Sequence, residues 1–124
     1  MAWIEVHQTL VRHRKTLRLA KELRINRHRA IGLIIDLWCW SIDNAPDGDL
    51  SRLTPSEISA ALAWTGNAPS FLRSLRASGF LDADDHLHDW DEYAGRLIDK
   101  RNENAARMRE IRTKKKGTQL EVVQ

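Results

Sequence analysis

Residues 50–90, LSRLTPSEISAALAWTGNAPSFLRSLRASGFLDADDHLHDW, carry most of the local signals that decide the fold. Thr54-Pro55-Ser56-Glu57 has the form of a capping box, in which the threonine hydroxyl accepts from an amide three residues on and the glutamate reaches back. It predicts a helix that begins at Pro55 and ends near Gly66, with the glycine as a left-handed C-cap. The preceding Pro46-Asp47-Gly48-Asp49 predicts a turn with its glycine in the left-handed region.

A second helix is predicted at residues 70–78, after the turn-forming residues 67–69. Phe71, Leu72 and Leu75 lie three to four positions apart and give this helix one apolar face. Its opposite face carries short polar or basic side chains, which suit contacts with phosphates and base edges. The candidate DNA-binding residues on that face are Ser70, Arg73, Ser74 and Arg76.

The chain after this helix predicts a small β-hairpin. Gly79 ends the helix, residues 80–81 and 86–90 have the pattern of short strands, and residues 82–85 are turn-rich. Two helices followed by two strands around a tight turn are the layout of a winged helix-turn-helix. We therefore predict a mainly α fold with a small β-wing, and DNA as the first partner to consider. The alternative is a small α+β domain whose helix pair touches no nucleic acid.

The chain before residue 50 predicts a short extended segment, at residues 3–7, and two more helices. The first helix spans about Thr9 to Leu23, with Arg14, Arg18 and Lys21 aligned on its outer face. These three residues are candidate phosphate contacts, and a solvated helix face is the alternative interpretation.

The next helix is predicted from Arg27 to about Asn44, with Asn26 as its N-cap. It is apolar nearly all round, so we expect it to be the central buried helix. Cys39 within it is expected to be a small core residue rather than a nucleophile. Core or subunit contact is also favoured over base stacking for Trp38, Trp40 and Trp64.

A last helix is predicted from about Tyr93 to Lys116, with Gly117 as its stop. Its apolar stripe is too thin for a coiled coil, and its basic distal half either attracts phosphate or is a solvated tail. The candidate DNA-binding residues there are Arg107, Arg109, Arg112, Lys114, Lys115 and Lys116. We thus expect a winged-helix domain at residues 1–95, a basic C-terminal helix at 96–116 and a disordered tail at 117–124.

The net charge of +3 hides a strong segregation of charge along the chain. The balance is +6 over residues 1–35, −8 over residues 36–95 and +5 over residues 96–124. A nucleic-acid footprint would therefore come mainly from the first helix and the C-terminal segment. Three aspartates at the predicted wing tip would repel phosphate, so the tip is expected to face protein or solvent: Asp82, Asp84 and Asp85.

The composition excludes several classes of protein. One cysteine allows no internal disulfide and no zinc site of the usual spacing, which fits a reducing cytoplasm. The longest apolar stretch, residues 31–42, is too short to span a bilayer, and the first residues lack the pattern of a signal peptide. We therefore predict a cytoplasmic protein without a membrane partner.

Catalytic patterns are scarce. His86 and His88 share one face of the predicted returning strand, but a third well-spaced metal ligand is lacking. The sequence contains no Gly-rich phosphate loop, nucleophile elbow or paired-carboxylate pattern. We predict a non-enzyme with no catalytic residues, no metal and no cofactor.

Several short motifs together carry a resemblance to a known family. They are WIEVH at residues 3–7, Leu37-Trp38, NAPDGDL at residues 44–50, SGFLD at residues 78–82 and LHDWDEY at residues 87–93. Over roughly residues 3–95 the chain resembles the N-terminal winged-helix domain of phage replisome organisers, the DnaD-like replication-initiation proteins. The resemblance implies a DNA-binding, self-associating module in phage or prophage replication initiation. Those proteins usually continue into a second domain for single-stranded DNA and helicase-loader contacts, and this sequence ends at Gln124, so the resemblance leaves the loading function open.

Two classes of function follow from the sequence. The first is a DNA-binding replication protein, with duplex or single-stranded DNA and replication proteins as partners. The second is a protein-interaction or oligomerisation module, or a transcriptional regulator, built on the winged-helix fold. A homo-oligomer, with a dimer favoured, is expected in both classes because so small a chain with five tryptophans cannot bury every aromatic.

Overall fold

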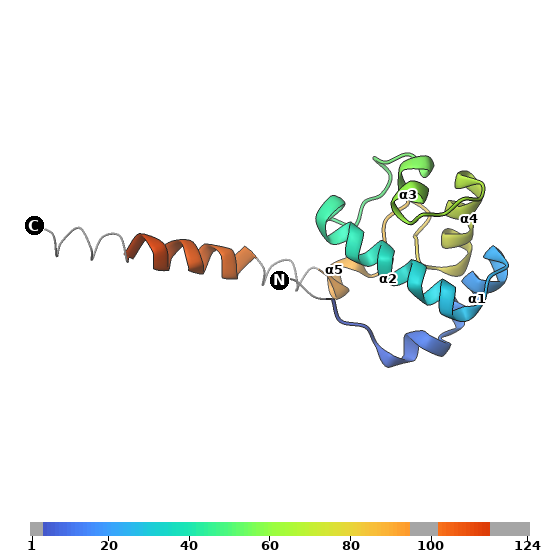
Figure 1. Ribbon diagram of the computed structural model, residues 1–124, viewed down its shortest axis with the longest axis horizontal. Coiled ribbons are helices and arrows are strands. Elements are labelled where there is room, and N and C mark those ends of the chain that lie inside the picture. Colours follow the sequence, from blue (N-terminus) through green and yellow to red (C-terminus); the bar gives the residue numbers. More distant parts are fainter. Residues whose placement is uncertain (1–3, 95–101, 115–124) are drawn as a thin grey trace, which may run out of the picture.

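The structure, a computed structural model, describes residues 4–94 and 102–114 and is mainly helical (Figure 1). The named elements in chain order are η1 (Gln8–Arg12), α1 (Arg14–Leu23), α2 (Arg27–Asn44), α3 (Pro55–Ala61), α4 (Ala68–Ser78) and α5 (Trp90–Tyr93). Residues 102–114 are also helical, and every side chain of this segment is exposed. The α part of the expected fold class is therefore confirmed.

The predicted N-caps form as expected. The Thr54 hydroxyl accepts from the Glu57 amide at 3.2 Å, with Pro55 as the first residue of α3. The Asn26 side chain accepts from the Arg29 amide at 2.8 Å, and α2 has the predicted bounds. The start of α4 differs by two residues, because Asn67 is itself the cap that accepts from the third amide on.

The end of α3 was predicted wrongly. The helix stops at Ala61, and the left-handed residue is Ala63, with φ of 53°. Gly66 is required for a different reason, since a Cβ there would lie 2.7 Å from the indole nitrogen of Trp64. The glycine therefore makes room for a side chain two residues away and does not cap the helix.

The predicted first helix divides into two. His13 has an extended backbone between η1 and α1, and its imidazole Nδ1 accepts from the Lys15 amide at 3.1 Å. The buried Thr16 hydroxyl donates to the Leu10 carbonyl at 2.7 Å and ties the two segments together. Before η1, residues 4–7 carry no regular structure.

The β-wing is the main departure from the expected fold. Among the described residues the structure has no strand, and the pairing is limited to the isolated antiparallel bridges Leu81–Leu87 and Asp49–His86. Backbone bonds from Asp82 to the His86 carbonyl, at 2.8 Å, and from His88 to the Phe80 carbonyl, at 3.1 Å, flank the first bridge. The pairing stops there because Asp85 and Asp89 have positive φ, which turns the chain out of an extended path at both ends.

The turn that follows α2 is joined closely to residues 85–90. The Leu87 amide donates to the Gly48 carbonyl at 2.8 Å, and the Trp90 indole donates to the Pro46 carbonyl at 2.8 Å. Gly48 has φ of 77°, as predicted, and its Cβ position lies 2.6 Å from the Trp90 ring. Only glycine therefore allows both the positive φ of this turn and the close packing of the buried Trp90 ring against it.

The core lies where α1 packs against α2 and α4, and α3 packs against α4. Apolar side chains of α4 face inward as predicted, namely Phe71, Leu72 and Leu75. On α2 the buried residues occupy one side only, and Cys39 is exposed, so the expectation of a core cysteine on a helix buried all round is wrong. In the described part of the chain no helix has the length and apolarity needed to cross a membrane.

The predicted last helix, from about Tyr93 to Lys116, is described as a helix at residues 102–114. A short helix, α5, ends at Tyr93, where the predicted helix was expected to begin. Residues 95–101 and 115–124, including the predicted stop at Gly117, lie outside the described residues.

Candidate nucleic-acid interface

Helices α1 and α4 lie side by side and antiparallel. Near the start of α1, the Lys15 side chain runs past Gly79, the residue that caps the end of α4. One turn further along α1, Arg18 donates from Nη1 to the Ala77 carbonyl at 3.4 Å. The outer face of α1 is therefore continuous with the outer face of α4.

This shared face carries a row of cations that we call the basic ridge, consisting of Arg14, Arg18 and Lys21 of α1 and Arg73 of α4. All four side chains are exposed. Arg14 and Lys21 flank Arg18 at helical spacing, and Arg73 lies one turn before Ala77, which Arg18 contacts. Within residues 4–94 no ridge residue forms an ion pair with a described carboxylate.

The other predicted residues of α4 do not belong to this exposed face. Ser74 is 7% exposed and its hydroxyl donates to the Ser70 carbonyl at 3.1 Å, so its expected place on the solvent side is wrong. Ser70 itself is half-buried. Arg76 is half-buried and binds both carboxylate oxygens of Asp85, which holds the turn against α4.

The carboxylates of the turn after α2 bind partners within the same turn. Asp47 and Asp49 both pair with Arg52. A hydrogen bond from the Asp49 amide is the main cause that lowers the pKa of Asp47, and bonds from the hydroxyl and amide of Ser51 lower the pKa of Asp49. These carboxylates therefore serve the turn itself.

His86 lies at the junction of the two turns. Burial disfavours its charged form, but the Leu87 and Asp47 carbonyl oxygens and the carboxylates of Asp91 and Asp84 outweigh that effect and raise the pKa of His86 above its ordinary value of 6.5. Its Nδ1 lies 3.0 Å from the Leu87 carbonyl oxygen. The imidazolium form is thus favoured by its position in the fold.

The predicted two-histidine pair is not arranged as a metal site. His88 lies between Asp82, at 2.8 Å, and Asp89, at 3.3 Å, whereas His86 faces the preceding turn. Within residues 4–94 and 102–114 no group of three or more histidine, cysteine, aspartate or glutamate side chains could hold a metal ion.

The predicted C-terminal contacts lie on the helix at residues 102–114 as far as the structure describes them. The exposed basic residues there are Arg107, Arg109, Arg112 and Lys114. Lys115 and Lys116 lie outside the described residues. The first four therefore add cationic surface beyond the basic ridge.

Sequence reasoning missed a cation–aromatic group near the other end of α4. The Arg29 guanidinium lies 5.3 Å from the Trp64 ring centroid, and Trp64 stacks on Phe71 at 5.0 Å with 16° between the ring planes. The excess of arginine after Leu23 was a signal for it, but the pairing with Trp64 depends on where the segment between α3 and α4 places that ring relative to α2. Arg24, the left-handed C-cap residue of α1, is a further exposed cation.

Comparisons with family models, with curated proteins and with solved structures found no match. The candidate interface is therefore argued from the residues of this chain alone.

Proposed function

We propose that the chain is a DNA-binding protein of the winged helix-turn-helix type that acts in phage or prophage replication initiation. The observation that carries the DNA-binding part is the basic ridge, whose exposed cations lie on two packed helices without carboxylate partners among the described residues. Such a row can neutralise successive phosphates of one strand. The replication role rests on the short motifs that resemble the replisome organisers.

The order of the elements supports the winged-helix part of the proposal. Helices α2, α3 and α4 follow one another, and the bridge residue Asp49 comes between α2 and α3 while Leu81 and Leu87 come after α4. These are the positions that the strands of a winged helix occupy, reduced here to single bridges. In this arrangement α4 is the recognition helix and Arg73 is its exposed cation directed to DNA.

The test is a duplex-binding titration with the double variant Arg18→Ala plus Arg73→Ala. We expect a loss of about 1–3 kcal/mol in binding free energy if either arginine contacts a base edge. The matched control is Arg52→Ala, which removes a cation that is paired within the acidic turn. Fluorescence anisotropy measures the affinity, and circular dichroism checks the fold; unchanged affinity of a folded double variant would remove the ridge from the interface.

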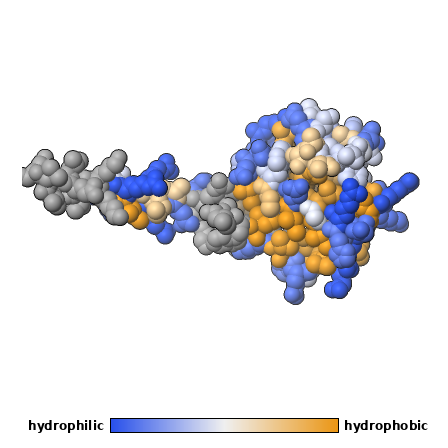
Figure 2. Space-filling view, in the orientation of Figure 1, coloured by the Kyte–Doolittle hydropathy of each residue, from blue (hydrophilic) through white to orange (hydrophobic). Residues whose placement is uncertain are grey.

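A second candidate function, self-association, is favoured by the apolar surface. Figure 2 shows hydrophobic residues gathered over α2, where Ile31, Ile35 and Ile42 are only half-buried. On the helix at residues 102–114, Met108 and Ile111 are 50% and 45% exposed. We propose a homodimer that covers part of this surface. A monomer mass that stays constant up to tens of micromolar protein would contradict it.

A further inference from the structure

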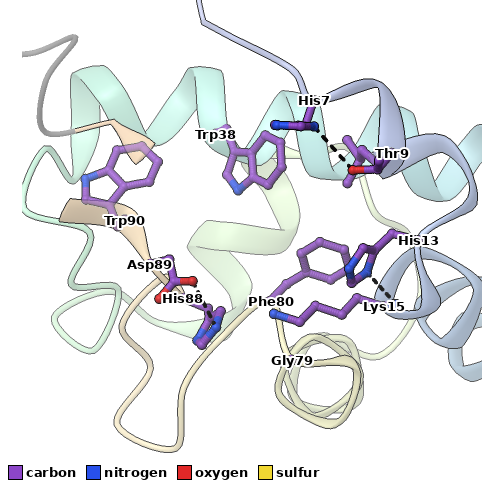
Figure 3. Close-up of a pocket in the computed structure, with 11 residues that line it drawn as sticks. His7, Thr9, His13, Lys15, Trp38, Gly79, Phe80, His88, Asp89 and Trp90 are labelled. Atoms are coloured by element: carbon purple, nitrogen blue, oxygen red, sulfur yellow. Dashed lines mark hydrogen bonds and ion pairs between the residues drawn. The ribbon is translucent and has the colours of Figure 1, made fainter. Parts of the chain in front are cut away.

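A cleft of about 290 Å³ opens between the start of α1, the middle of α2 and the residues that follow α4 (Figure 3). Its volume is close to the lower end of the range for small-molecule sites, so it suits a ligand group of modest size. Three aromatic side chains line it, Trp38, Phe80 and Trp90. Polar groups from residues 7–15 and from residues 88–89 stand beside these rings.

The aromatic side chains form rigid walls. Trp38 and Phe80 meet edge to face, with ring centroids 6.5 Å apart and 62° between the planes. Trp90 is held by its indole bond to the Pro46 carbonyl, and Phe80 is 7% exposed. Trp38 is half-buried and is the wall on which a flat ring can stack, since stacking does not require a particular hydrogen-bond pattern.

One side of the cleft is cationic. Figure 3 shows the Lys15 side chain running under Phe80 with its amino group directed toward the cleft. Its stem passes 3.2 Å from the Cβ position of Gly79, so the absence of a side chain there lets the lysine lie flat. His13 uses Nδ1 to cap α1, which leaves the proton of its neutral ring on Nε2 as a donor.

The segment that follows Phe80 contributes His88 and the Asp89 carboxylate to the cleft. His88 lies between two carboxylates, with Nδ1 2.8 Å from Asp82 and Nε2 3.3 Å from Asp89. An anion in the cleft is repelled by these carboxylates and attracted to Lys15. The cleft therefore has an aromatic interior with one cationic edge, which fits a flat ring joined to an anion.

We propose that this cleft binds one unpaired nucleotide of single-stranded DNA, with the base among the aromatic walls and its phosphate at Lys15. The position of the cleft supports a strand over a free nucleotide, because Lys15 of the cleft packs on Gly79 at the end of α4, two residues from Ala77, which Arg18 of the basic ridge contacts. A strand that follows the ridge thus reaches the cleft without a break. This inference rests on the proposed DNA-binding function and specifies that the cleft at the end of the ridge binds a single strand.

The test compares oligothymidylate with a duplex of the same length by fluorescence anisotropy at low salt. Trp38→Leu removes a stacking wall, and we expect it to weaken oligothymidylate binding about tenfold and duplex binding much less. Lys15→Met keeps the apolar stem over Gly79 and removes the charge; it should weaken the single strand and reduce its salt slope by about 1. The matched control is Lys21→Met on the ridge, which should weaken both ligands by the same factor.

The outcomes separate this proposal from the proposed function. Cleft variants that bind both ligands like the wild type, or weaken both by one factor, overturn the cleft and leave the ridge standing. Oligothymidylate binding that depends on Lys15 without any duplex binding supports the cleft and contradicts a duplex-binding ridge. If free thymidine monophosphate competes, a single nucleotide is a sufficient ligand; if it does not, a strand is required. If the protein binds neither oligothymidylate nor thymidine monophosphate, the proposal is overturned. If a thermal melt shows that the Trp38→Leu variant is unfolded, the Lys15→Met variant alone tests the proposal.

Discussion

The acidic turn region and the basic ridge lie on one small molecule and use their charges in opposite ways. In the turns, the aspartate carboxylates bind Arg52, Arg76, His88 and backbone amides, so their charges have partners within the fold. On the ridge, the arginines and the lysine are exposed and form no ion pair with a described carboxylate. We propose that unpaired charge on packed helices, rather than the net charge of a segment, marks the interface. Changes in the turns should therefore affect stability, and changes on the ridge should affect binding.

The largest effect is expected at Gly48. Alanine there must adopt a positive φ and place its Cβ 2.6 Å from the Trp90 ring, so we expect a loss of about 2–5 kcal/mol in the free energy of unfolding. Gly32→Ala is the matched control, because its Cβ meets nothing within 4 Å and alanine is the better helix former. Urea unfolding should show Gly32→Ala gaining about 0.5–1 kcal/mol. Equal effects of the two substitutions would refute the role of the Gly48 turn.

A smaller effect is expected from the ion pair that fixes the turn to α4. Asp85→Asn keeps a residue that tolerates the left-handed backbone but removes the charge bound by Arg76. We expect a loss of about 1 kcal/mol in unfolding free energy, because the pair is only partly exposed. Arg73→Gln on the ridge should stay within about 0.5 kcal/mol. If the ridge variant were the less stable of the two, the contrast between the regions would fail.

The smallest effect is a pH dependence at His86. Its pKa is raised in the folded protein, so its charge stabilises the fold fully below the ordinary value of 6.5, and this contribution is lost as pH rises through the folded pKa. The difference in unfolding free energy between wild type and His86→Gln should therefore be largest in mild acid and shrink toward neutral pH and above. Urea titrations across this range measure it, and a difference that grows with pH would show the opposite linkage.

Local signals in the sequence predicted much of the fold. The caps at Thr54 and Asn26, the left-handed glycine at position 48 and the end of the helix at Gly79 were found because each depends on a few neighbouring residues. The exposed α1 row of the ridge was also found, since helical spacing alone places Arg14, Arg18 and Lys21 together.

The failures share a tertiary cause. The predicted strands reduce to single bridges because Asp85 and Asp89 turn the chain, and Ser74 is buried because α4 packs on more than its apolar face. Cys39 is exposed since the other elements cover only one side of α2. The cleft could not be predicted at all, because His13, Trp38 and His88 come from segments that meet only in the folded chain.

The central claim is that the unpaired cations of the ridge bind DNA phosphates, and the salt dependence of duplex binding tests it most directly. Each neutralised phosphate contributes about 0.9 to the slope of log affinity against log salt. A variant with Arg14, Arg18, Lys21 and Arg73 all changed to glutamine should remain folded and show a slope shallower by about 3.6 if each contacts one phosphate, whereas Arg52→Gln should match the wild type. An unchanged slope in the folded ridge variant would contradict the account.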